Sequence, residues 1–139
     1  MTRPEALIWD DHYAVGIAEI DDEHRALFDE YNKIISDNAE TTDPALVKAA
    51  VLMLEQYAER HFHNEERVMI ECDYPHYQNH KMLHELFLAN LVYLNGALAE
   101  GQDAYYELCR FFRTWLISHI MIRDAEVAVY AGHHAAPTD

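Results

Sequence analysis

Apolar residues recur at intervals of three and four residues in four separate segments of the chain, and this spacing constrains the fold most. Such a period places the apolar side chains along one side of an α-helix. No segment alternates between apolar and polar residues strongly enough to predict a half-buried β-strand. Only four glycines and four prolines are present, so few residues interrupt the helical segments. The sequence predicts an all-α protein, an up-down-up-down antiparallel four-helix bundle.

The chain is interpreted as a single domain of residues 1–139. An extended arm is expected over 1–20 and a short tail or helix over 125–139. Asp21 or Asp22 is expected to cap the first helix, because a side-chain oxygen at that position accepts a backbone N–H of the first turn. The four predicted helices cover residues about 21–40, 44–72, 76–100 and 103–122.

Charge and composition exclude several classes of protein. With 25 acidic and 10 basic residues the net charge is −15, which argues against nucleic acid and anionic membrane surfaces as partners. No run of 18 apolar residues predicts a membrane span, and the first residues lack the apolar region of a secretory signal. We therefore expect a cytoplasmic monomer. Cys72 and Cys109 form no CxxC motif and are interpreted as packed thiols.

Polar residues lie on the inner stripe of all four predicted helices, where apolar residues are expected. Residues four apart differ by only about 40° around a helix axis, so two such side chains can reach one metal centre. Burying this many polar groups without partners costs roughly a few kcal/mol each, and a bound metal removes that cost. The inner polar residues are His24 in the first helix, His61 and Glu65 in the second, His80 and His84 in the third, and His119 in the fourth.

The identity of the metal remains open from the donor types alone. Imidazole with carboxylate suits iron, zinc, copper or nickel. The HExxH pattern of zinc proteases is absent, and no histidine has a glutamate three residues before it. The Glu-x-x-His motif of ferritin-like di-iron proteins is therefore absent as well. The chain uses a different set of ligands.

Four segments, in this order, resemble those of the hemerythrin family, specifically the single-domain bacterial hemerythrins. They are VGIAEIDDEH at 15–24, HFHNEE at 61–66, HKMLH at 80–84 after a YP pair, and WLISHIMIRD at 115–124. The resemblance begins at Trp9 and covers nearly the whole chain. It implies a non-haem di-iron centre that binds dioxygen reversibly.

The resemblance also implies how the ligands are divided between the two irons. His80, His84 and His119 would hold one iron, and His24 and His61 would hold the other. Two carboxylates, Glu65 and Asp124, together with an oxo or hydroxo group, would bridge them. The iron held by His24 and His61 would then keep the open position at which dioxygen binds.

Reversible binding requires a pocket that excludes water. The candidates for this pocket are Leu27, Phe28, Trp115, Leu116 and Ile120. Partners that orient the imidazoles through their second ring nitrogen are expected, but the sequence does not identify them.

Asp124 lies five residues after His119, about 140° away from it on a regular α-helix. For both to reach one centre, the helix must end, unwind or widen between Ile120 and Asp124. We therefore predict a local break or a π-type distortion in this segment.

The remaining histidines are interpreted as surface residues. They are His12, His63, His76, His133 and His134. Alternative functions on the same ligands remain open: a di-iron enzyme acting on dioxygen, peroxide or nitric oxide, a sensor of oxygen or iron that works through a partner, and iron storage or repair.

Overall fold

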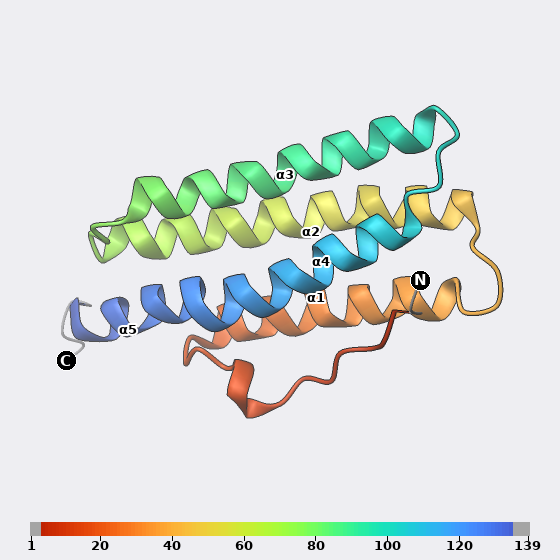
Figure 1. The fold of residues 1–139 in the computed structure, drawn as a ribbon. Coiled ribbons are helices and arrows are strands. Elements are labelled where there is room, and N and C mark those ends of the chain that lie inside the picture. The colour runs from red at the N-terminus through yellow and green to blue at the C-terminus, as the bar shows by residue number, and fades with distance from the viewer. Residues whose placement is uncertain (1–3, 135–139) are drawn as a thin grey trace.

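The computed structural model describes residues 4–134, with the side chains of Met121, His133 and His134 outside that description. Four long helices run antiparallel to their neighbours along the chain (Figure 1), and no strand occurs within the described residues. The predicted all-α, up-down-up-down bundle is confirmed. The elements are η1 (Asp11–Tyr13), α1 (Ala18–Asp37), α2 (Pro44–Glu71), α3 (Tyr77–Ala99), α4 (Tyr105–Ser118), the π-helical η2 (His119–Asp124) and α5 (Ala125–His134).

The first helix starts earlier than its predicted cap. α1 begins at Ala18, and neither Asp21 nor Asp22 is its N-cap residue. The Asp21 carboxylate instead accepts the backbone N–H groups of Val15, at 2.7 Å, and Gly16, at 3.2 Å. Gly16 has a φ of +91°, a conformation that glycine adopts without steric cost. Asp21 lies in the first turn of α1, and its two hydrogen bonds hold the residues just before the helix against that turn.

The N-terminal arm lies along α1 (Figure 1). The Asn32 side chain binds both backbone groups of Leu7, accepting its N–H at 2.8 Å and donating to its carbonyl at 2.7 Å. The rings of Trp9 and Tyr13 pack on Phe28 at centroid distances of 5.1 and 4.8 Å. One 3₁₀ turn, η1, interrupts the extended arm. The arm thus covers the outer side of α1 next to the first predicted ligand.

Two apolar clusters fill the bundle, and a polar layer separates them. Along α2, Phe62 belongs to the main core and Met69 to a smaller cluster at the end of the bundle, with Glu65 between them. Along η2 and α5, Asp124 stands in the same way between Ile120 and Val127. The buried polar groups are therefore closed off from solvent on both sides along the bundle axis.

The tail after Asp124 continues as helix α5 and completes the smaller cluster. Val127 is buried there, and Tyr130 donates its hydroxyl to the Asp73 carbonyl at 3.3 Å. α5 also contacts α2. This packing covers the end of the bundle next to the polar layer.

α3 is the one described helix that is long and apolar enough to cross a membrane by length and composition. Those two properties also fit the core helix of a bundle, and α3 packs along α2. Its outer side carries the exposed side chains of Met82, Leu86, Val92 and Tyr93. Its inner side carries two of the buried histidines, His80 and His84.

Candidate metal centre

The antiparallel topology brings the polar residues of all four helices to one end of the bundle. α1 and α3 begin at this end, whereas α2 and α4 finish there (Figure 1). The polar residues lie near those starts and finishes, so they meet in a single layer. The seven residues in this layer are His24, His61, Glu65, His80, His84, His119 and Asp124, each no more than 4% exposed.

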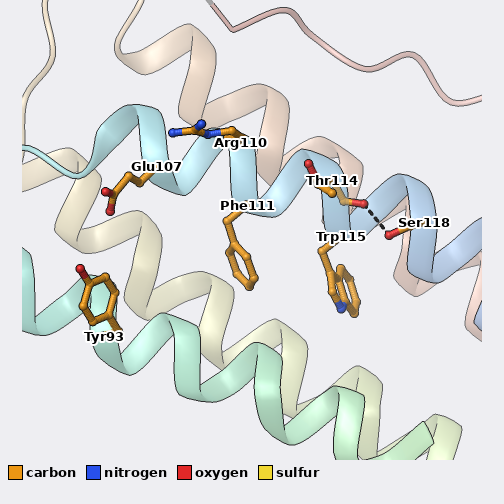
Figure 2. A pocket seen from close by; sticks show the side chains of 7 residues that line it. All are labelled: Tyr93, Glu107, Arg110, Phe111, Thr114, Trp115 and Ser118. Atoms are coloured by element: carbon orange, nitrogen blue, oxygen red, sulfur yellow. Dashed lines mark hydrogen bonds between the residues drawn. The ribbon is translucent and has the colours of Figure 1, made fainter.

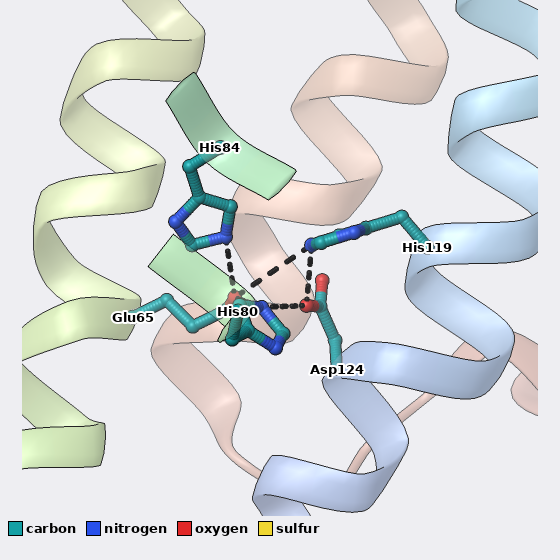
Figure 3. A group of neighbouring side chains, drawn as sticks. All are labelled: Glu65, His80, His84, His119 and Asp124. Atoms are coloured by element: carbon teal, nitrogen blue, oxygen red, sulfur yellow. Dashed lines mark hydrogen bonds and ion pairs between the residues drawn. The ribbon is translucent and has the colours of Figure 1, made fainter. Parts of the chain in front are cut away.

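Five of these side chains converge in a first group (Figure 3). Oε1 of Glu65 lies 3.0 Å from Nε2 of His84 and also contacts Nε2 of His80. Oδ1 of Asp124 lies 3.1 Å from Nε2 of His80 and 2.9 Å from Nε2 of His119. The ligand atoms of the whole group all lie within 4.8 Å of one another. Three imidazoles and two carboxylates thus point at a common centre.

Four side chains form a second group that overlaps the first. Nε2 of His24 lies 2.8 Å from Oδ2 of Asp124 and 3.1 Å from Nε2 of His61. Oε2 of Glu65 lies 3.6 Å from Nε2 of His61. Glu65 and Asp124 therefore belong to both groups, and in each case the two oxygens of the carboxylate face different groups.

Several of these buried atoms lack the well-aligned hydrogen bonds that burial normally demands. Among the described residues, Oε2 of Glu65, both carboxylate oxygens of Asp124 and Nε2 of His119 have no hydrogen-bond partner despite their short distances to one another. Polar atoms that crowd around one point without well-aligned hydrogen bonds are arranged as the ligands of a cation are. The residues present therefore fit a metal centre, and the buried His, Glu and Asp cluster is capable of binding metal.

In the metal-free chain, neighbouring carboxylates hold protons on His61 and His80. Burial by itself lowers the pKa of His61, but the carboxylates of Asp124, Glu23 and Glu65 outweigh it and raise the pKa to about 10. Burial also lowers the pKa of His80, but Asp124 and Glu65 outweigh this effect and raise the pKa to about 9. These protons supply the positive charge that a metal supplies when it binds.

Burial pushes the pKa of both carboxylates upward, and repulsion by Asp124 adds to this for Glu65, but the surrounding histidines outweigh these effects. The pKa of Glu65 is lowered by contacts with His119, His80 and His84. The pKa of Asp124 is lowered well below its ordinary value by His119, His24 and His61. Both groups are therefore held as anions inside the bundle.

The π-helical segment η2 brings Asp124 into the site. A π-helix closes its hydrogen bonds between residues five apart, so residue i+5 comes to lie over residue i. Asp124 consequently stands over His119, although the two would face different directions on a regular α-helix. The predicted distortion between Ile120 and Asp124 is confirmed.

Sequence reasoning missed two carboxylates that contact the outer nitrogens of the histidines. Oε1 of Glu23 lies 3.1 Å from Nδ1 of His61, and Oε2 of Glu66 lies 2.9 Å from Nδ1 of His84. Each glutamate directly precedes or follows a predicted ligand in the sequence. No spacing signal identifies them, because each one contacts a histidine on a neighbouring helix.

Four of the five residues expected around dioxygen, Leu27, Phe28, Leu116 and Ile120, are at most 1% exposed and lie in the main core. The fifth, Trp115, is partly buried and stacks on His119 at a centroid distance of 4.6 Å, with the ring planes 14° apart. Trp115 thus lies against a histidine of the first group.

The same tryptophan lines a surface groove of about 590 Å³ between α3 and α4 (Figure 2). Tyr93 lines the groove from α3, and the other lining residues come from α4. None of the seven clustered residues lines it. The indole of Trp115 therefore stands between the open groove and the ring of His119.

The other histidines lie away from the cluster. His12, His63 and His76 are exposed, and His76 is the N-cap residue of α3. The side chains of His133 and His134 lie outside the described part of the structure. Cys72 and Cys109 are buried free thiols.

Comparison with known proteins identifies the family. The model of the hemerythrin HHE cation binding domain matches residues 15–131. Bacteriohemerythrin of Clostridium acetobutylicum is 31% identical over 124 residues, covering 86% of this chain and 96% of that protein. Myohemerythrin of Riftia pachyptila is 32% identical over 117 residues, covering 84% of this chain and 87% of that protein. The crystal structure of wild-type hemerythrin matches with a TM-score of 0.81 at 25% identity, covering 95% of this chain and 100% of that one. The chain therefore belongs to the hemerythrin family.

Proposed function

We propose that the seven clustered side chains bind two non-haem iron ions and that the chain binds dioxygen reversibly at this pair. One observation supports the proposal above all. The cluster consists of two overlapping groups that share Glu65 and Asp124. A carboxylate with one oxygen toward each group is suited to bridging two ions. A site for a single ion does not need this arrangement.

The two irons would receive different numbers of protein ligands. His80, His84 and His119 with the two shared carboxylates offer five ligands to one iron. His24 and His61 with the same carboxylates offer four to the other. With a bridging oxo or hydroxo group these numbers would become six and five. The iron held by His24 and His61 would then keep one open position.

The donor set is compatible with iron, and the family favours it. Five imidazoles and two carboxylates, with no thiolate among them, suit iron as well as zinc, copper or nickel. When bound, the iron pair supplies the two electrons and the open position that reversible binding of dioxygen requires.

The chain's own residues keep the site dry. Leu27 and Phe28 follow His24 on α1, and Leu116 and Ile120 flank His119, all of them buried. The arm closes the outer face of Phe28. The buried Tyr31 donates its hydroxyl to the Glu5 carbonyl at 3.2 Å and not to the cluster. If these buried apolar residues surround the open position, they favour release of dioxygen over its protonation and reduction, so we infer a carrier and not an enzyme.

A cycle of oxygenation tests this function. The iron-loaded protein is reduced without air, exposed to dioxygen, and then purged with inert gas while its visible spectrum is followed. A new absorption band that disappears on purging and returns on re-exposure supports a carrier. Oxidation in one direction to a stable ferric form, with turnover of added peroxide, would instead assign the chain to the enzymes.

A further inference from the structure

Two of the five clustered histidines carry a carboxylate on the ring nitrogen that faces away from the cluster. His61 has Glu23 at 3.1 Å from its Nδ1, and His84 has Glu66 at 2.9 Å from its Nδ1. In both rings Nε2 is the nitrogen that faces the cluster, toward His24 in one case and Glu65 in the other. The same arrangement therefore occurs once in each of the two groups.

The two glutamates stand just outside the cluster. Each is next to a cluster residue in the sequence, and a step of one residue turns the side chain by about 100° around the helix. Glu23 thus points from α1 to His61 on α2, and Glu66 points from α2 to His84 on α3. They are 18% and 20% exposed at the side chain, whereas the histidines they contact are almost completely buried.

Glu23 is itself held in place. The side-chain amide of Asn64 donates to Oε2 of Glu23, leaving Oε1 for His61. Asn64 and His61 both belong to α2, so one helix supplies both contacts of this carboxylate. His24, the other histidine of the second group, has a buried Nδ1 with no hydrogen-bond partner among the described residues. His61 is therefore the histidine of this group that a carboxylate orients.

We propose that Glu23 and Glu66 are positioning residues, one for each metal ion. Each accepts the Nδ1–H of its histidine, which fixes the tautomer whose Nε2 lone pair faces the ion. The carboxylate also makes the imidazole a stronger donor and offsets one positive charge of the buried ions. Glu23 acts on the ion that keeps the open position, and Glu66 acts on the ion with the full set of ligands.

The assignment of each glutamate to one ion rests on the proposed function, but its test does not require dioxygen. Zinc serves as a probe because it is diamagnetic, accepts imidazole and carboxylate, and does not change oxidation state. The full chain is loaded with Zn²⁺, and the ring nitrogens and their protons are observed by ¹H–¹⁵N correlation spectroscopy. His61 and His84 should each show an Nδ1–H that exchanges slowly with water.

Substitutions separate orientation from charge. Glu23→Ala should remove the slowly exchanging proton of His61 alone. It should also lower the binding affinity for one of the two zinc ions by roughly 10- to 100-fold. Glu66→Ala should do the same for His84 and the other ion. Glu23→Gln and Glu66→Gln keep an acceptor oxygen without the charge, so they should retain the slow proton and lose less affinity. Glu59→Gln, an exposed site on α2, controls for loss of one negative charge.

The possible outcomes distinguish this inference from the proposed function. If the unchanged chain binds two zinc ions and both alanine variants keep wild-type affinities and both slow protons, the positioning role is wrong. If the protons and affinities change as expected but the iron form does not bind dioxygen reversibly, only the proposed function fails. A chain that binds no zinc at the cluster contradicts both. Melting curves of the glutamine variants show whether any loss of affinity reflects misfolding.

Discussion

Oδ1 of Asp124 lies 2.9 Å from Nε2 of His119, although five residues separate the two positions and a regular helix would turn them about 140° apart. The π-helical segment η2 makes this contact possible. The same segment points the other oxygen of Asp124 at His24, 2.8 Å away. A local widening of one helix thus supplies a carboxylate to both halves of the cluster.

Asp124→Ala should therefore disturb both ions at once. We expect the iron content to fall from two ions to fewer than one per chain, because each half of the cluster loses a ligand. Iron analysis after reconstitution and desalting measures this directly. Glu126→Ala is a matched control, since Glu126 is an exposed acidic residue two positions further along the same chain segment. An Asp124→Ala protein that retains both ions would show that this carboxylate does not bridge them.

Removal of the metal should destabilise the fold. A ligand that binds only the folded state adds about 4 kcal/mol when it is present at 1,000 times its dissociation constant. For a chain of this size that corresponds to a melting temperature higher by on the order of 10 °C. Differential scanning calorimetry before and after chelation should show a drop of this order, reversed by adding the metal back. An unchanged melting temperature would mean that the cluster contributes its residues to the fold without holding a metal.

The metal-free protein should lose stability as the pH rises above neutrality. The pKa values of His61 and His80 are raised from 6.5 to about 10 and about 9, so their contribution is complete below pH 6.5 and is lost as the pH passes through 9 to 10. The lowered pKa values of Glu65 and Asp124 add stability above their ordinary values of 4.5 and 3.8, and this is lost as the pH falls. Urea unfolding should thus give the largest free energy of unfolding between about pH 4.5 and 6.5.

The metal-loaded protein should not lose stability in this way above pH 6.5, because its histidines are already unprotonated. Metal must displace the protons from these histidines, so its affinity should increase as the pH rises toward their raised pKa values. Parallel pH titrations of the two forms provide the control. Identical pH dependence in both forms would contradict the competition between protons and metal.

Trp115→Ala should open a path from the surface groove to the cluster. The indole stacks on His119 and also lies 4.4 Å from Phe87, centroid to centroid, so its loss leaves one side of the His119 ring facing the groove. We expect irreversible oxidation of the reduced iron form to become several-fold faster. Stopped-flow spectroscopy under air measures the rate. Tyr93→Ala removes an aromatic ring from the same groove, 65% exposed and away from any clustered histidine, and should leave the rate unchanged.

The sequence was sufficient to predict the four-helix bundle and the buried side of its helices. The spacing of residues such as Leu27, Phe28 and Tyr31 predicts a helix with one buried side, and these residues are indeed buried in α1. Helical period alone gives this result, because it depends only on local geometry. His76, His80 and His84 are also spaced four residues apart, so the period does not decide which two of them face inward. The interval after the YP pair in the family resemblance selects His80 and His84, and both are buried in α3.

Other features depended on contacts that no local pattern records. The start of α1 could not be read from Asp21, because this aspartate binds the backbone of Val15 and Gly16 and not the first turn of its own helix. Glu23 and Glu66 were missed because their role depends on which helix lies beside them. The family resemblance, and not the helical period, pointed to Asp124 as a member of the cluster. The need to bring it beside His119 then predicted the distortion.

The number of metal ions per chain shows directly whether the two overlapping groups of ligands, joined by Glu65 and Asp124, hold two ions. The protein is reconstituted with ferrous iron without air, freed of loosely bound metal by desalting, and analysed by mass spectrometry for iron against protein concentration. We expect two irons per chain, and one iron or none in a correctly folded protein would contradict a di-iron centre.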